Sequence, residues 1–233
     1  MSLISCLSVF DRSGARSERR RVGAVGGLLL LSLLSACSVI PERPVRPTQY
    51  DFGPGLSSAP ATPAKAKLPV LVLADLEPSG LLDSSSLVLY RLGYTGDQQL
   101  RPYAQARWAL PPAQLVRLRL RDLLGTQHAV LSATEGAALQ RSPDQPLRVL
   151  RLELEEFSQV FERADQSSAL VRLRATLLDN RAAGETLLAQ RVFVARHPAS
   201  SPDAAGGVLA LTQATDQLAQ TLAQWVDAVP AKP

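Results

Sequence analysis

Cysteine and histidine are scarce in this 233-residue chain, which holds two of each. The histidines, His128 and His197, have no second histidine at metal-binding spacing, and the motif H-E-x-x-H does not occur. The cysteines, Cys6 and Cys37, both lie near the N-terminus. The rest of the chain therefore has no thiol for a disulfide framework or a metal site. We expect neither a metal nor another cofactor.

The motifs that mark common enzyme sites are missing as well. There is no G-x-S-x-G elbow and no glycine-rich phosphate loop. Glu153, Glu155 and Glu156 could serve as an acid pair, but they stand among arginines, and a solvated charged face is the better interpretation. The residues that flank His128 and His197 give no sign of a catalytic triad. We expect no enzymatic activity, with a hydrolase of dispersed catalytic residues as the alternative.

The uncharged run near the N-terminus is too short to cross a membrane. It covers thirteen residues, 22–34, and follows three consecutive arginines, Arg19 to Arg21. A membrane-spanning helix needs about 20 residues. A basic head, a short apolar core and small residues before a cleavage site are typical of a secretory signal peptide. We predict such a signal peptide over residues 1–36.

The signal peptide ends in Leu34-Ser35-Ala36-Cys37, which resembles a bacterial lipobox. In lipoproteins that cysteine is acylated and becomes the first mature residue, so we predict that Cys37 carries fatty chains, palmitate among them. Two or more chains hold a protein stably on a bilayer. By resemblance to lipoprotein sorting, Ser38 in place of aspartate favours the outer membrane, with the protein facing the periplasm. An ordinary signal peptide or a free N-terminal helix is the alternative.

Loss of the signal peptide changes the net charge. Residues 1–36 carry five of the 25 Lys and Arg residues and two of the 21 Asp and Glu residues. The remainder has 20 basic and 19 acidic side chains, a net charge of +1, against +4 for the whole chain. A nearly neutral domain has little attraction for a polyanion. We therefore expect no nucleic-acid partner.

Proline is concentrated just after the predicted lipidation site, with seven prolines in residues 38–69. Proline lacks a backbone donor and fixes φ, so few of these can sit inside a regular ladder. We expect residues 37–67 to comprise the lipidated cysteine, a proline-rich tether and a loop, with a candidate short strand at 49–52. A single globular domain is expected to follow at 68–229.

The spacing of apolar residues predicts the elements of that domain. Alternation of apolar and charged residues predicts half-buried strands, and a change of phase at Glu155-Glu156 predicts a bulge. Antiparallel pairing would place Glu153 and Glu155 near Arg172 and Arg174, which favours this register. The expected strands lie at 68–76, 87–94, 150–161, 169–177 and 187–195, with a candidate at 127–132.

Two helices are expected. Pro111-Pro112 begins one that runs to about Leu124, with Arg117, Arg119 and Arg121 facing solvent or, as an alternative, lipid phosphates. The other covers about 202–228, with Ser201 as N-cap and Asp203 in the first turn. The predicted fold is α/β (α+β), a single domain with a mixed sheet of about five or six strands, largely antiparallel in its second half, packed by two main helices.

A segment rich in tyrosine, arginine and tryptophan separates the strand at 87–94 from the first helix. It reads R-P-Y-A-Q-A-R-W over residues 101–108. Such side chains are enriched at protein interfaces. The alternative for the tryptophan is a loop aromatic packed against the core. The candidate partner contacts are Tyr90, Arg101, Tyr103, Arg107 and Trp108.

The same segment carries a resemblance to a known family. The matching residues are Tyr90-Arg91-Leu92, Tyr94, Leu100-Arg101-Pro102-Tyr103, Trp108-Ala109, Pro111-Pro112 and Leu115-Val116. Together with the lipobox, the proline-rich tether and the apolar stripe of the last helix, they resemble the ABC-type transport auxiliary lipoproteins. The likeness covers nearly all of the chain after Cys37. A departure is Tyr50-Asp51-Phe52, where many relatives carry Tyr-Tyr-x-Leu.

The resemblance implies an accessory role in the transport of lipids or other hydrophobic molecules. It implies as partner the periplasmic, mammalian-cell-entry-domain subunit of an ABC transporter, met at the outer membrane. A phospholipid ligand and a homo-oligomer stay open. The alternative function is that of a structural or assembly lipoprotein of the envelope without lipid cargo.

Overall fold

The computed structural model describes residues 45–55, 70–80, 85–139, 147–181 and 184–230. The chain divides into two units, Met1–Val45 and Arg46–Pro233, and every element below belongs to the second. The predicted signal peptide 1–36, the predicted lipidation site Cys37 and the part of the predicted tether before Val45 lie outside the described residues. The second unit begins at Arg46.

The sheet is built around one long strand, β6 (Leu147–Arg163). On one side β6 pairs first with β2 (Val70–Pro78) and then with β3 (Leu87–Leu92), both parallel. The outer strands there are β5 (Ala129–Ser132) beside β2, β4 (Gly96–Trp108) beside β3, and β1 (Thr48–Tyr50) beside β4. Because β6 has 17 residues, it is long enough to pair with two shorter strands, one after the other, along the same edge.

On its other side β6 begins an antiparallel meander with β7 (Gln166–Arg181) and β8 (Gly184–Pro198). The alternating leucines and charges of the sequence follow the pleat, because successive side chains of a strand point to opposite faces. The expected bulge is present, since Leu154 pairs with Leu173 and Glu156 with Arg172 while Glu155 is the extra residue.

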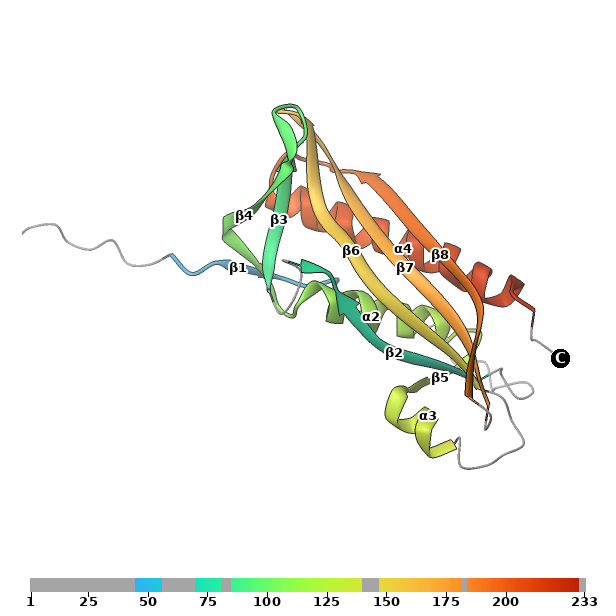
Figure 1. The fold of residues 1–233 in the computed structure, drawn as a ribbon. Coiled ribbons are helices and arrows are strands. Elements are labelled where there is room, and N and C mark those ends of the chain that lie inside the picture. Colours follow the sequence, from blue (N-terminus) through green and yellow to red (C-terminus); the bar gives the residue numbers. More distant parts are fainter. Residues whose placement is uncertain (1–44, 56–69, 81–84, 140–146, 182–183, 231–233) are drawn as a thin grey trace, which may run out of the picture. The chain divides into compact units, whose positions relative to one another are not determined.

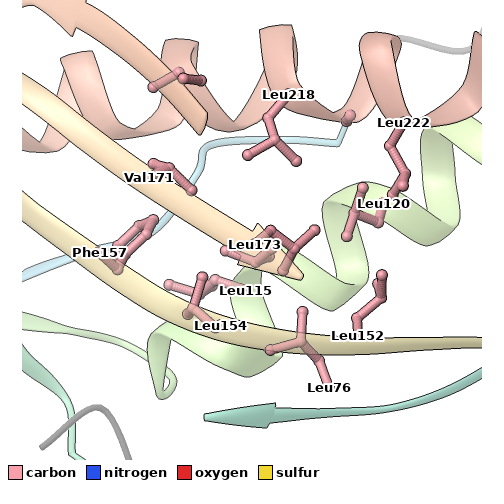
Figure 2. Packing of buried hydrophobic residues seen from close by; sticks show 14 of the residues in the cluster. Leu76, Leu115, Leu120, Leu152, Leu154, Phe157, Val171, Leu173, Leu218 and Leu222 are labelled. Carbon is pink, nitrogen blue, oxygen red and sulfur yellow. The ribbon is translucent and has the colours of Figure 1, made fainter. Parts of the chain in front are cut away.

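One face of the sheet is covered by two helices, α2 (Pro112–Leu124) and α4 (Ala204–Ala228) (Figure 1). Leucines of both helices meet the inward residues of β6 and β7, and Figure 2 shows Leu120, Leu218 and Leu222 directed at this layer. Burial of each such side chain contributes roughly 1.5–3 kcal/mol. The core is thus a sandwich of helices on one sheet face.

The opposite face is covered only at one end, among the described residues, by the short helix α3 (Ala133–Leu139). There Val72, Val149 and Leu178 form a second, small apolar cluster with Leu147. A Cβ on Gly136 would lie 2.6 Å from a methyl carbon of Val72, so the glycine permits this close approach. Most of this face, here called the open face, carries charged side chains of β6 and β7.

The expected fold class is confirmed: a mixed sheet, antiparallel in its second half, is packed by two main helices. Over the residues that the structure describes, the sheet has eight strands rather than five or six. The largest difference is β4, because no strand was expected between the strand at 87–94 and the helix that begins at Pro111-Pro112. α3 was not expected either.

The N-cap of α4 also differs from expectation. Asp203, not Ser201, is the N-cap, and its carboxylate accepts a hydrogen bond from the amide of Gly206 at 2.8 Å. The Ser201 hydroxyl donates to the same carboxylate at 2.8 Å. Pro202 therefore precedes the helix instead of occupying its first position.

Candidate functional site

The candidate contact residues lie on β3 and β4, and the structure divides them. Tyr90 of β3 and Tyr103 of β4 form a pair with ring centroids 4.7 Å apart, and Tyr90 also meets Phe161 edge-on at 5.8 Å. Both tyrosines are half-buried. Their positions on hydrogen-bonded strands make this a pre-formed aromatic surface.

Hydrogen bonds through buried side chains fix the position of Tyr103. Its hydroxyl donates to Oε1 of Gln159 at 2.8 Å, and the Gln159 amide donates to the Ser167 hydroxyl at 2.7 Å. Gln159 is fully buried. Burial, and then the nearby Tyr90 and Asp203, raise the pKa of the Tyr103 hydroxyl above its ordinary value. Tyr103 is therefore a neutral hydrogen-bond donor with a fixed ring.

The two arginines of the segment have different surroundings. Arg101 is half-buried and donates to the side-chain oxygen of Gln99, with N–O distances of 3.1 and 2.6 Å. Arg107 donates through Nη1 to the backbone oxygens of Tyr103 and Ala106, each at 2.7 Å. Arg107 thus supports its own strand, while Arg101 stays accessible beside the tyrosine pair.

Trp108 belongs to the core and not to the surface. It is 1 % exposed and packs on Phe52 and Phe157, each at a centroid distance of 5.6 Å. Its Nε1 has no hydrogen-bond partner among the described residues. The structure therefore matches the alternative of a core aromatic, and Trp108 has no surface to offer a partner.

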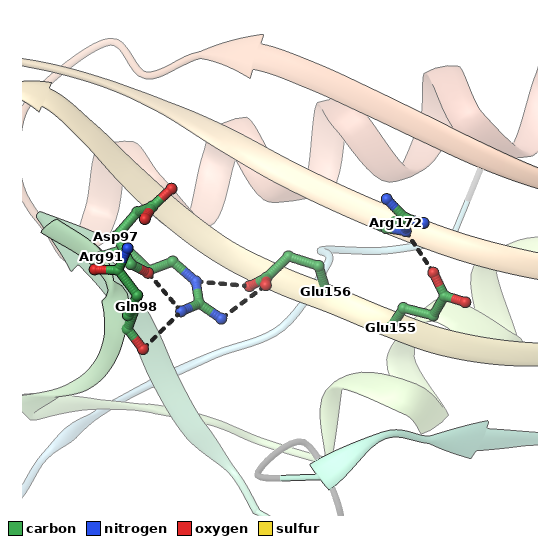
Figure 3. A network of polar contacts seen from close by, with 6 residues as sticks. All are labelled: Arg91, Asp97, Gln98, Glu155, Glu156 and Arg172. Carbon is green, nitrogen blue, oxygen red and sulfur yellow. Dashed lines mark hydrogen bonds and ion pairs between the residues drawn. The ribbon is translucent and has the colours of Figure 1, made fainter. Parts of the chain in front are cut away.

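The open face carries an ordered set of ion pairs instead of a catalytic acid pair. Arg91 of β3 binds Glu156 at 2.8 Å and donates to the backbone oxygen of Asp97 at 2.8 Å (Figure 3). Glu155 is paired with Arg172, also drawn in Figure 3, and with Arg174 at 2.6 Å. The expected juxtaposition of the β6 glutamates with the β7 arginines is confirmed.

These contacts set the ionisation of the glutamate at the bulge. The hydrogen bond from Arg172 lowers the pKa of Glu155 most, with Arg174 adding to the effect against partial desolvation. A carboxyl group held ionised in this way cannot act as a general acid near neutral pH. The arrangement specifies strand register and a solvated face.

Two hollows of similar size flank the sheet. One, of about 300 Å³, lies on the open face among charged side chains that include Asp75, Arg151 and Arg174. The other, of about 330 Å³, is more apolar and lies between the Phe52 segment and α2, with Leu110 and Leu118 at its rim. Sequence reasoning did not identify this second hollow, because its walls come from three separate segments.

Arg119 is another residue whose setting differs from expectation. It is 8 % exposed, and its Nε lies 2.6 Å from a carboxylate oxygen of Asp216 on α4. It therefore joins the two helices rather than facing solvent or lipid. Its neighbour Arg117, in contrast, is more exposed and pairs with Asp75 at 3.1 Å.

Neither metal chemistry nor membrane insertion has a candidate in the described part of the chain. No group of three or more His, Cys, Asp or Glu side chains there is placed to hold a metal ion. No helix described is long and apolar enough to span a bilayer.

Comparison with known proteins assigns the chain to a family. The model of the ABC-type transport auxiliary lipoprotein component matches residues 50–223. The chain belongs to this family. In this auxiliary lipoprotein the match covers the tyrosine pair, helix α2, the whole β6–β8 meander and helix α4 as far as residue 223. Its family assigns it to ABC-type transport as an auxiliary component.

Solved structures support the fold of the auxiliary lipoprotein. A crystal structure of a protein from Xanthomonas campestris is similar with a TM-score of 0.58 at 22 % identity, covering 77 % of this chain and 94 % of that one. A second crystal structure, of an uncharacterized protein, has a TM-score of 0.55 at 16 % identity, covering 78 % and 99 %. No curated relative matches the chain.

Proposed function

We propose that this auxiliary lipoprotein is a lipid-anchored, periplasmic adaptor of an ABC-type system that moves phospholipid or another hydrophobic molecule. In this proposal Cys37 is acylated and holds the domain at the outer membrane. The domain docks onto a periplasmic transporter subunit that carries a mammalian-cell-entry domain, and it performs no catalytic step. Membership of the auxiliary lipoprotein family supports the transport role.

The observation that carries the docking role is the fixed, half-buried tyrosine pair with Arg101 beside it. Tyrosine and arginine are enriched among residues that dominate binding energy. Tyr103 is immobilised by Gln159 and Tyr90 by Phe161, so little side-chain entropy remains to be lost on binding. Arg101 adds a charge at the edge of this surface.

Single substitutions of Tyr90 and of Arg101 test this docking surface. Full-length protein bearing Y90A or R101E would be cross-linked in membranes of the source bacterium and purified. We expect recovery of the mammalian-cell-entry subunit to fall about tenfold or more for each, because loss of such a contact costs at least 1–2 kcal/mol.

Matched controls lie close by on the same end of the sheet. Tyr94 is 49 % exposed in the turn between β3 and β4, and Arg163 is exposed at the end of β6. Y94A and R163E remove the same chemistry from other positions and should leave recovery unchanged. Equal losses in all four variants, or none in Y90A and R101E, would contradict the assignment of this surface.

A further inference from the structure

β8 is a long free edge of the sheet. The other two ends of the sheet are the three-residue β1 and the four-residue β5, whereas β8 has 15 residues. Of the strands described, only β7 pairs with β8, so the outer backbone groups of β8 have no strand partner. Long edges of this kind readily pair with another strand, and proteins usually keep them short or covered.

The side chains of this edge show a complementary pattern. Leu187 and Val194 are 59 % and 55 % exposed. Both lie on the open face, because their partners on β7 are Leu178 and Arg172. Glu185 and Arg196 also lie on that face, further out toward either end of the strand. Gln190 and Val192 lie between Leu187 and Val194 on the same face, so the order along it is acid, apolar, amide, apolar, apolar, base.

The charged ends of this order and the apolar residues next to them are self-complementary when two copies of the strand run antiparallel. We propose that β8 pairs with β8 of a second copy of this chain about a two-fold axis at Arg191. Leu188 is the extra residue of a bulge, since Leu177 pairs with Ala189 and Leu178 with Leu187. Counted around that bulge, Val194 faces Leu187 of the second copy, Arg196 faces Glu185, and Val192 faces Gln190.

This register is the one that satisfies both kinds of pair. A two-fold axis perpendicular to the sheet places the open faces of both copies on the same side. The register can therefore change only by two residues at a time, because a shift of one residue would move every side chain to the other face. An axis at Gln190 would place Val194 opposite Glu185, and an axis at Val192 would place Arg196 opposite Leu187. Each alternative keeps an apolar pair, Val192 with Leu187 or Val192 with itself, but neither places Arg196 opposite Glu185.

Two features of β8 limit the strength of the dimer. Arg191 meets the Arg191 of the second copy at the axis, and like charges opposite one another weaken a strand pair. Its guanidinium lies 5.1 Å above the ring of its own Phe193. Glu185 already accepts two hydrogen bonds from Arg151, at 2.8 and 2.9 Å. We therefore expect a reversible dimer in equilibrium with monomer.

Single cysteines test the position of the axis in the full-length protein in membranes. Opposed residues of antiparallel strands have Cα atoms about 4.5–5.5 Å apart, within the range of a disulfide. R191C should therefore yield an oxidised dimer on a non-reducing gel. In V194C the two cysteines would be about 20 Å apart. We therefore expect this variant to form no more oxidised dimer than the parent chain does.

The double variant L187C/V194C should again give the dimer, because these positions face each other across the axis. Absence of the R191C dimer, or an equal dimer from V194C alone, would overturn the proposed pairing. The parent chain, with Cys6 and Cys37 as its only cysteines, sets the background.

Charge exchange provides an independent test that needs no cysteine. E185R and R196E each place like charges together, and we expect each to weaken dimerisation of the full-length protein in detergent about tenfold by light scattering. The double variant E185R/R196E restores opposite charges and should restore the dimer. Unchanged association in the single variants, or no recovery in the double, would refute this register.

Discussion

Gly207 makes the closest approach at the start of α4. A Cβ at this position would lie 2.0 Å from Oε1 of Gln159, the atom that accepts the Tyr103 hydroxyl. A side chain here would displace Gln159 and with it the support of the tyrosine pair. The glycine is required by space and not by backbone conformation.

We predict that G207A lowers the free energy of unfolding by about 1–3 kcal/mol, the usual cost of an overpacked buried site. Shortening the opposing side chain makes room, so Q159A/G207A should be more stable than the sum of the two single changes predicts. Urea denaturation of the four proteins measures this coupling. Additive effects would show that Gln159 and Gly207 do not compete for the same space.

At the residue scale, the sequence indicated which side chains are unusual better than it indicated which of them are buried. The tyrosines and arginines of residues 90–108 were identified as unusual, yet their sequence positions could not separate Trp108 in the core from Arg101 at the surface. Burial depends on contacts from distant segments: Phe52 and Phe157 enclose Trp108. The Asp216 that pairs with Arg119 lies 97 residues away in the chain.

Among the elements, strands with alternating apolar residues were the predictable ones. β6, β7 and β8 follow that alternation, and the bulge at Glu155 was visible as a break in it. β4 escaped prediction because its outer part, with mainly polar residues and Pro102, carries no such pattern. Its strand conformation comes from pairing with β3 and β1, which is tertiary information.

The pairing of α2 with α4 includes an ion pair between the buried Arg119 and the partly exposed Asp216. Removing Asp216 takes the carboxylate partner from the buried charge of Arg119, so D216L should lower stability by about 1–3 kcal/mol. An apolar pair of similar volume has no charge to desolvate, and R119M/D216L should recover most of that loss. Chemical denaturation checks both values. A double variant as unstable as D216L would contradict a charge-based explanation.

The N-terminus of α4 predicts a defined dependence on pH. The hydrogen bond from the Gly206 amide lowers the pKa of Asp203 most, and Ser201 adds to this. A carboxyl group whose folded pKa is depressed stabilises the fold above its unfolded pKa, near 3.9. That contribution is lost as the pH falls below about 4 through the folded pKa.

Asp203 variants separate the cap from its charge. D203A should lower the free energy of unfolding at pH 7 by about 1 kcal/mol, whereas D203N should retain most of the cap. Both should flatten the decline of stability below pH 4 relative to the parent. Thermal unfolding between pH 2 and 7 measures this, and an unchanged acid limb in both variants would assign the decline to other carboxyl groups.

For the whole molecule, our proposal gives the domain and the N-terminal segment separate roles. The sheet, its two covering helices and the tyrosine surface all belong to the unit that begins at Arg46. Attachment to a membrane depends, in our proposal, on Cys37 alone. A single acyl chain gives only marginal binding, so the proposed multiple chains are needed for a permanent anchor.

Replacement of Cys37 should therefore change the location of the protein without changing the stability of its fold. We predict that C37A moves the protein from the membrane fraction of the source bacterium to a soluble or unprocessed form, without changing the denaturation midpoint of the domain. Mass spectrometry of the mature N-terminal peptide should show fatty chains on Cys37 of the parent. Y90A, which keeps Cys37, should stay in the outer-membrane fraction even where it loses its partner, and this difference distinguishes anchoring from docking. An unmodified Cys37 in membrane-bound parent protein would require another means of attachment.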